Sequence, residues 1–326
     1  MGLVSAVSGN RLPGVLVRRA AQGVGVALVV SALCFVVVRA LPGDAAYRIA
    51  AGRYGYDLVD AAAADAVRAE LGLDRPAWQQ YAEWVLALFR LDLGESLVTS
   101  RPVVDELGLY LVGTLQLSVL ALALAALIGG GLGVVAARRP DGAVDRLVTG
   151  WIAAVRALPP FLLGLLLVLL LSIQLGWLPA VGHEGAASIV LPALTLGIGL
   201  SGLFARVTRD AVVEVRRSDY VRFAATKGLS GRVVLLRHVL RNTGVVLVPY
   251  LGVQAVTLVE GVVVVESLFA WPGLGHALVH AVFWRDVPVL QASALVLALL
   301  VVALNTLVDV TVLWLDPRPR GRRAVA

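Results

Sequence analysis

The chain has 326 residues, of which 59% are hydrophobic and only 15% are charged, and its formal net charge is +6. A mean hydropathy of +0.86 is far above that of soluble domains and indicates a polytopic membrane protein. The single cysteine, Cys34, excludes a disulfide framework and a thiolate metal site built from this chain alone.

The chain contains six apolar stretches close to the length of about 20 residues that a helix needs to cross a bilayer. They predict an all-α fold with six transmembrane helices over residues 20–39, 111–136, 148–174, 189–205, 243–266 and 290–313. The predicted domains are a cytoplasmic N-terminal segment (1–19), a periplasmic insertion (40–110), a transmembrane core (111–313) with a cytoplasmic loop (206–242), and a cytoplasmic tail (314–326).

The segment between the first two spans carries eleven acidic residues and is too long to be a simple turn. Its stretch AAAADAVRAELGLDRPAWQQYAEWVLALFRLDLG has the periodicity of two amphipathic helices, interrupted between Gly72 and Pro76. We therefore expect a small helical subdomain outside the membrane.

The distribution of basic residues predicts the orientation. With the N-terminus inside, 19 of the 28 Lys and Arg residues lie in inner segments, as the positive-inside rule requires. Both termini and the 206–242 loop are then cytoplasmic, and attraction to anionic lipid accounts for the net charge without nucleic acid. A cleaved signal peptide is the alternative for the first span, but that span is long for one and no clear cleavage site follows.

Residues 219–242, DYVRFAATKGLSGRVVLLRHVLRN, form a basic stretch within this apolar chain. Ser218 or Asp219 can cap a helix that ends near Lys227, and Gly228 suits the left-handed turn that follows. Ser230 can cap a second helix that continues into the fifth span.

On the first of these helices, Tyr220, Phe223, Ala224 and Lys227 share one face by their spacing. Such a face fits a groove in a partner protein. It fits equally well on lipid headgroups, and periodicity alone does not choose between them.

This stretch resembles the cytoplasmic "EAA" loop of type I ABC importer permeases, in the form used by the dipeptide and oligopeptide (peptide/nickel) subfamily. The resemblance extends in order from about residue 15 to 320 and favours the first of the two paired permeases. Its other motifs are LPGD at 41–44, LGLDRP at 71–76, LDLGES at 91–96, ESLFAWPGLG at 266–275, RDVPV at 285–289 and DPRPR at 316–320.

The resemblance implies that the loop docks on a cytoplasmic ABC ATPase and transmits its motion to the membrane. The implied coupling residues are Tyr220, Arg222, Ala224, Ala225, Lys227, Gly228, Leu229 and Arg232. The implied partners are that ATPase, a second homologous permease, an extracytoplasmic substrate-binding protein, membrane lipid and a short peptide, in a bacterial cytoplasmic (inner) membrane. In one departure from the subfamily pattern, the proline of the fifth span, Pro249, comes later than usual, so its start is expected to bend differently.

No GxxxxGK[ST] phosphate-binding loop is present, and the glycines of IGGGLGVVAA at 128–137 lie within a span, where they ease helix packing. The chain is therefore expected to hold no cofactor, with ATP and Mg²⁺ bound by the partner ATPase.

Polar residues within or beside the spans are the candidates for a translocation pathway. Glu266 is expected either to line or close the pathway or to make structural hydrogen bonds. Arg156, beside Pro159 and Pro160, marks either a cavity-lining break in the third span or a simple kink. The pathway candidates are Glu260, Glu266, Gln254 and Arg156, and the resemblance assigns Trp271, Pro272, Gly273 and Gly275 to a periplasmic gate or loop.

Catalytic and metal-site motifs are missing from the sequence. The four histidines form no HExxH motif, although His276 and His280 are four residues apart, and no GxSxG word occurs. We predict a permease for di- or oligopeptides rather than an enzyme. The alternatives are a permease for glutathione or a nickel chelate, and a stand-alone secondary transporter or channel.

Overall fold

The computed structural model describes residues 12–72, 75–90 and 92–315, and these form an all-helical membrane protein, as predicted. Five helices are long and apolar enough to cross a bilayer, and a sharply bent helix pair brings the number of candidate spans to six. Residues 1–11 of the predicted N-terminal segment and residues 316–326 of the predicted tail lie outside the described residues.

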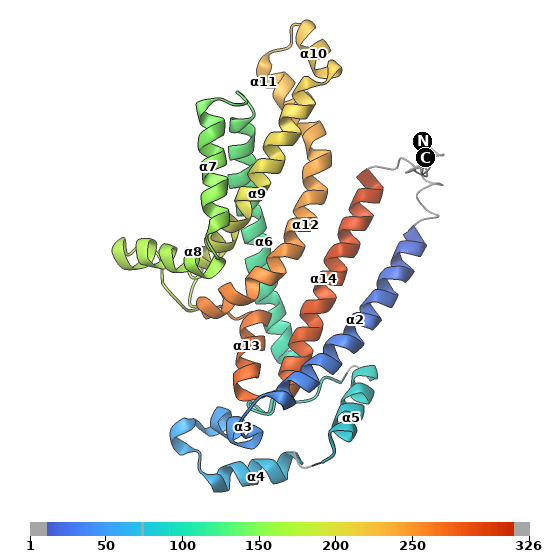
Figure 1. Ribbon diagram of the computed structural model, residues 1–326, viewed down its shortest axis with the longest axis vertical. Coiled ribbons are helices and arrows are strands. Elements are labelled where there is room, and N and C mark those ends of the chain that lie inside the picture. The colour runs from blue at the N-terminus through green and yellow to red at the C-terminus, as the bar shows by residue number, and fades with distance from the viewer. Residues whose placement is uncertain (1–11, 73–74, 91, 316–326) are drawn as a thin grey trace.

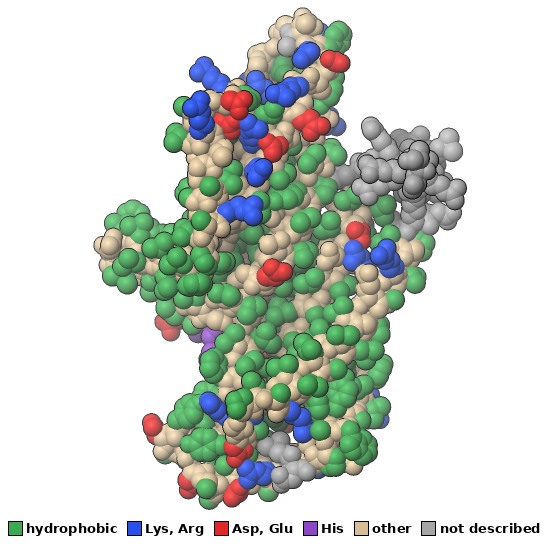
Figure 2. Space-filling view, viewed as in Figure 1, with side chains coloured by type: hydrophobic (Ala, Val, Ile, Leu, Met, Phe, Trp, Pro, Cys, Tyr) green, Lys and Arg blue, Asp and Glu red, His purple; other side chains and the backbone are tan. Residues whose placement is uncertain are grey.

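The long helices run between two ends of the molecule (Figure 1). The basic end is formed by the turn between α6 and α7 and by α10 and α11; the insertion end is formed by α3, α4 and α5. Lys and Arg side chains gather at the basic end, and a broad apolar band separates the two ends (Figure 2). The spanning helices and helix pairs are α2 (Leu12–Ala40), α6 (Val103–Ala136), α7 (Ala143–Ala157) with α8 (Pro160–Leu167) and the π-helix η2 (Val168–Gln174), α9 (Val190–Arg217), α12 (Arg241–Leu268) and α14 (Val287–Leu315).

The third predicted span is not one straight helix. Residues 143–157 and 160–174 are bent by 105° relative to each other, and α8 projects sideways from the bundle (Figure 1). Pro159 and Pro160 supply no backbone N–H, and Leu158 takes the extended conformation (φ −92°, ψ 120°) that a following proline favours. The proline pair therefore ends α7 and turns the chain, as the sequence indicated, by more than an ordinary kink.

Two spans extend beyond their apolar cores at the basic end. α9 continues to Arg217, and a continuous helical run from Gly231 to Leu268 joins α11 (Gly231–Val233), the π-helix η3 (Val234–Leu240) and α12. Between them, α10 (Asp219–Thr226) forms the tip of the molecule (Figure 1).

The insertion contains α3 (Ala45–Tyr54), the short 3₁₀ helix η1 (Tyr56–Leu58), α4 (Ala61–Leu71) and α5 (Ala77–Phe89). The break between Gly72 and Pro76 is therefore confirmed, and Gly72 ends α4 in the left-handed conformation. Ala46, Ile49, Ala64 and Val67 form a small core between α3 and α4.

Both ends of the insertion are fastened to the start of α14. The Arg285 guanidinium donates to the carbonyls of Leu41 and Pro42, where the insertion begins. The buried Asp286 carboxylate accepts from the Ser96 hydroxyl and the Leu97 N–H, near the end of the insertion. The LPGD, LDLGES and RDVPV motifs thus meet in one polar cluster, which their separation in the sequence did not reveal.

α6 and α9 pack closely because glycines face the contact. A Cβ at Gly129 would lie 2.5 Å from the Ser201 carbonyl oxygen, and one at Gly133 would lie 2.5 Å from that of Ala205. Atoms at such separations overlap, so these positions admit only hydrogen. This close approach agrees with the packing role expected for the glycine-rich stretch.

We expect Gly133→Leu to force α6 away from α9 and to destabilise the protein by about 3 kcal/mol or more, because backbone atoms of α9 cannot yield as a side chain would. The matched control is Gly131→Leu on the same helix, where a Cβ meets nothing within 4 Å. Thermal-stability curves of the two detergent-purified variants measure the difference. Equal midpoints for the two variants would contradict the packing role.

Candidate functional site

The tip helix α10 presents two different faces. Tyr220 and Phe223 are 46% and 61% exposed, and the Lys227 ammonium lies 4.6 Å from the centre of the Phe223 ring. Val221 and Ala224 are buried, and Val221 packs with Val212 of α9 in a small apolar cluster. The outer face of α10 is therefore aromatic and basic, and the inner face seats the helix on the rest of the chain.

Ala224 differs from the expectation that it shares the outer face with Tyr220 and Phe223. It is only 5% exposed and faces the chain itself, where α10 packs against α9 and η3. The side chain of Ala225 lies outside the described residues. Arg222, Leu229 and Arg232 are exposed at the tip.

The turn after α10 takes the predicted form. Gly228 has φ +77°, a backbone conformation that L-residues rarely adopt. The Ser230 hydroxyl then accepts from the Val233 N–H at 3.5 Å and caps α11. The chain thus reverses at Gly228 and returns toward the bilayer through η3.

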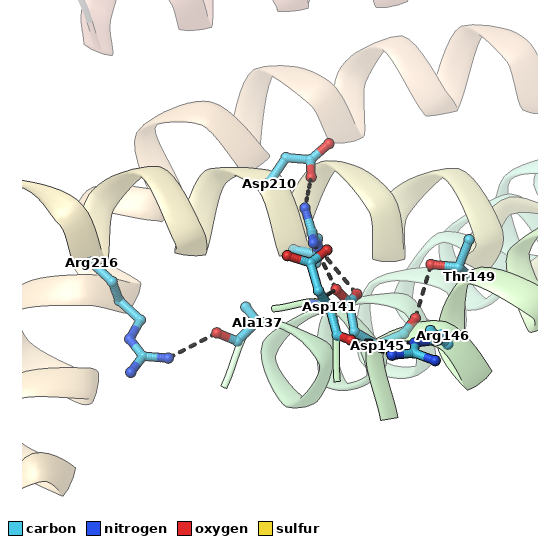
Figure 3. Close-up of polar contacts among 8 residues, drawn as sticks. Ala137, Asp141, Asp145, Arg146, Thr149, Asp210 and Arg216 are labelled. Atoms are coloured by element: carbon cyan, nitrogen blue, oxygen red, sulfur yellow. Dashed lines mark hydrogen bonds and ion pairs between the residues drawn. The ribbon is translucent and has the colours of Figure 1, made fainter. Parts of the chain in front are cut away.

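A polar cluster below the tip joins α7 to α9 (Figure 3). The Arg209 guanidinium contacts both oxygens of Asp145, with Nη2–Oδ2 at 2.7 Å and Nε–Oδ1 at 3.2 Å. The Asp145 side chain is 7% exposed and also accepts from the Asp141 N–H at 2.8 Å. A bidentate pair of this kind fixes the relative position of the two helices.

Two further contacts extend this cluster toward the tip (Figure 3). Arg209 Nη1 lies 2.9 Å from Asp210 Oδ1, and Arg216 Nη1 donates to the Ala137 carbonyl at 2.8 Å. The ends of α6, α7 and α9 are thus tied together directly before α10 begins. A displacement of α10 is therefore expected to move these three helices as one unit.

At the opposite end of α12, the Glu266 carboxylate is fully buried and accepts three hydrogen bonds. The donors are the Thr114 hydroxyl at 2.6 Å and the N–H groups of Gly275 and His276 at 2.7 and 3.3 Å. The last two N–H groups lie in the first turn of α13 (Leu274–Trp284), and the N-terminus of a helix favours a negative charge. Glu266 thereby fastens α6 to the corner between α12 and α13.

The tight motif AWPGLG forms that corner. The Trp271 indole N–H donates to the Gly113 carbonyl at 3.0 Å, and the Leu274 N–H donates to the Thr114 hydroxyl at 2.8 Å. A Cβ at Gly273 would overlap the Glu266 carboxylate, and one at Gly275 would overlap the Val263 backbone. The glycines are needed here for close packing.

Comparisons with known proteins identify the fold and the family. Residues 129–321 match the family "Binding-protein-dependent transport system inner membrane component", and residues 13–105, which include α2, match the N-terminal domain of such membrane components. The glutathione transport system permease protein GsiC of Pectobacterium atrosepticum is 41% identical over 295 residues, covering 90% of this chain and 94% of the relative.

The chain belongs to the binding-protein-dependent transport system permeases. GsiC proteins of Escherichia coli O6:H1 and K12 are 39% and 38% identical over 292 residues, with the same coverage. The inward-facing MetNI methionine ABC transporter shares the fold, with a TM-score of 0.56, 20% identity and coverage of 67% of this chain and 100% of that one. An amino acid ABC transporter solved with histidines has a TM-score of 0.50, 16% identity and coverage of 64% and 94%.

Family membership confirms several predictions at once. The chain is a multi-pass inner-membrane permease subunit of an ABC importer of the peptide/nickel family and not an enzyme. Such a permease works with a second permease, a cytoplasmic ATPase that hydrolyses ATP, and a substrate-binding protein. The alternative of a stand-alone secondary transporter or channel is not supported.

The four pathway candidates fall into two pairs, one buried and one exposed. Glu266 is buried in the corner described above, and Gln254 is buried with its amide donating to the Leu200 carbonyl at 3.1 Å. Glu260 on α12 and Arg156, in the last turn of α7, are exposed. The two exposed side chains are accessible from outside the chain, whereas the buried Glu266 makes the hydrogen bonds expected of its structural alternative.

Histidines do not assemble a metal site in the described part of the permease. The rings of His276 and His280 lie 4.4 Å apart on α13, but no group of three or more His, Cys, Asp or Glu side chains there is placed to hold a metal ion. Burial and the neighbouring His280 lower the pKa of His276, so this ring stays neutral at physiological pH.

We expect Glu266→Ala to destabilise the permease by about 3 kcal/mol or more, because three buried donors lose their acceptor. Glu260→Ala, six residues earlier on the same helix and exposed, should change stability by no more than about 0.5 kcal/mol. Thermal midpoints of the purified variants test both values. If Glu266 acts in the pathway instead, its removal will change uptake while leaving the midpoint unaltered.

Proposed function

We propose that this permease imports glutathione or a similarly small peptide. The observation that supports this substrate most strongly is the identity of about 40%, over nine-tenths of the chain, to permeases named for glutathione transport. These relatives favour the glutathione alternative over the broader prediction of di- and oligopeptides.

The substrate passes between this permease and a second one. One chain exposes long apolar surfaces, including Phe161, Leu165 and Leu169 along α8 and η2, and a side arm of this kind needs a covering partner or lipid. The exposed pair Arg156 and Glu260 then faces the shared pathway, where charged groups at membrane depth are normally found. The basic end faces the cytoplasm, as the positive-inside rule predicts.

The outer face of α10 docks on the ATPase. Tyr220 and Phe223 provide the aromatic surface, and Lys227, Arg222 and Arg232 provide positive charges for acidic groups of the ATPase. The Asp145–Arg209 pair supports this role, because it connects the helix that carries α10 to α7 and so to the bent pair. The motion of the ATPase on ATP-driven closure is thus transmitted to the membrane through the connected ends of α6, α7 and α9 rather than through a flexible loop.

The substrate is tested by uptake in cells that lack their own glutathione importer and express this permease with its partner ATPase, second permease and binding protein. We expect labelled glutathione to accumulate in an ATP-dependent way, and unlabelled glutathione to compete better than a dipeptide or a nickel chelate. Preferential competition by the dipeptide or the chelate would overturn glutathione as the substrate while leaving the importer role intact.

We expect Gly228→Asp to reduce uptake about tenfold or more, within the range of a coupling free energy of 1–3 kcal/mol. A side chain at φ +77° strains the turn that presents α10, and a carboxylate there weakens contact with acidic groups of the ATPase. The control is Gly231→Asp, which adds the same charge three residues later, where a Cβ meets nothing and φ is not positive.

Three measurements separate coupling from folding in these variants: the amount of permease in the membrane, the ATPase rate and the uptake rate. Gly228→Asp should reach the membrane in the normal amount and should retain ATP hydrolysis, but it should lose uptake. Uptake at the wild-type rate by Gly228→Asp, or equal losses in both variants, would refute the proposed coupling through α10.

A further inference from the structure

A pocket of about 430 Å³ lies at the insertion end, between the end of α2, α5 and the start of α14. Phe35, Val38, Ile49 and Leu97 line its apolar walls. Its polar lining consists of Arg39, Arg285, Trp84, Gln80 and Gln291, and no carboxylate is among the described residues that line it. The pocket therefore suits a ligand that has an apolar portion and a separate portion with hydrogen-bond acceptors.

Two buried donors in this pocket lack a partner within the described chain. The Gln291 side chain is 1% exposed and its Nε2 makes no hydrogen bond, and the same holds for the buried Nε1 of Trp84. Buried donors are normally paired, because an unpaired one forfeits its hydration without compensation. The residues that carry these donors line one cavity, and they come from elements about 200 residues apart, α5 and α14.

Two arginine side chains place positive charge at the same pocket. Arg39, in the last turn of α2, is exposed and lies over the Phe35 ring at 4.9 Å, and it makes no ion pair with any described residue. Arg285 is 7% exposed and already donates to the Leu41 and Pro42 carbonyls. An anionic oxygen near Arg39 would therefore meet an uncompensated positive charge.

The surroundings are those of a bilayer interface. Arg39 ends a membrane-spanning helix, and α5 beside it keeps Trp78, Leu86 and Phe89 exposed at 69%, 61% and 77%. The ring of Tyr81 on α5 is tilted against that of Phe35 on α2, with ring centres 5.1 Å apart. Aromatic residues at a span end and an amphipathic helix with an exposed apolar face are typical of the headgroup layer.

We propose that this pocket binds a glycerophospholipid of the leaflet on the insertion side. The phosphate pairs with Arg39, ester carbonyl oxygens accept from Trp84 Nε1 and Gln291 Nε2, and the acyl chains follow the exposed apolar face of α2 that includes Leu33 and Val36. The lipid thus holds the insertion against the span, independently of which substrate is carried.

The test measures lipid binding to the assembled transporter purified in detergent. Phosphatidylglycerol is titrated, and retained lipid is counted by native mass spectrometry while the thermal midpoint is recorded. We expect Trp84→Phe, which keeps an aromatic ring, and Gln291→Leu, which is close in volume, each to remove one donor and to weaken lipid binding several-fold. Arg39→Ala should weaken it about tenfold, since it removes a charge-assisted hydrogen bond.

Two control residues lie on or directly after α5, outside the residues that line the pocket. Trp78→Phe removes an exposed indole N–H from α5, and Arg90→Ala removes an exposed charge at the end of α5. Both should bind lipid as the wild type does. Wild-type lipid retention in Trp84→Phe and Gln291→Leu, or equal losses in the controls, would overturn the site.

Two soluble probes distinguish the sources of the ligand. Glycerol 3-phosphate has the headgroup chemistry without chains, and glutathione carries carboxylates. Neither should raise the thermal midpoint at concentrations where phosphatidylglycerol does. Protection by glycerol 3-phosphate equal to that by the lipid would instead indicate a free-anion site, and protection by glutathione would indicate a substrate subsite; either result would refute the lipid proposal.

Discussion

The bidentate contact between Arg209 and Asp145 is the interaction on which the basic end of the permease depends. A carboxylate that is almost fully buried needs a partner of opposite charge, and here that partner stands on the helix leading to α10. The same carboxylate accepts from the α6–α7 turn, so one side chain joins α7, α9 and that turn. Without it, the tip would be connected to the bilayer mainly through apolar contacts that allow sliding.

Glu266 has the corresponding role at the other end of the fold. Its carboxylate joins α6 to the corner of α12 and α13, so both charged anchors hold helices that the sequence places far apart. Between the two anchors, the apolar contacts of α6 with α9 can remain nearly uninterrupted. This arrangement suits a transporter, because motion must be transmitted between the ends of the helices while the middle stays closely packed.

The sequence predicted the all-helical fold, the break at Gly72 and the turn at Gly228, because apolar length, glycine and capping residues are local signals. The inward face of Ala224 was not predictable, since periodicity gives the residues of a face but not the side on which the rest of the chain lies. The Asp145–Arg209 pair and the Arg285–Asp286 cluster were also missed, because tertiary contacts between distant polar residues leave no periodic pattern. The bend of 105° at Pro159 was foreseen as a break, but its size depends on what α8 packs against.

The polar cluster of Arg285 and Asp286 separates the insertion mechanically from the membrane-spanning helices. Its hydrogen bonds hold the chain where the insertion leaves α2 and again shortly before α6, at one place on the membrane core. The segment between these two contact points begins and ends at the same place and contains a small hydrophobic cluster of its own. A change in the length or sequence of this stretch is therefore expected to leave the register of the membrane-spanning helices unaltered.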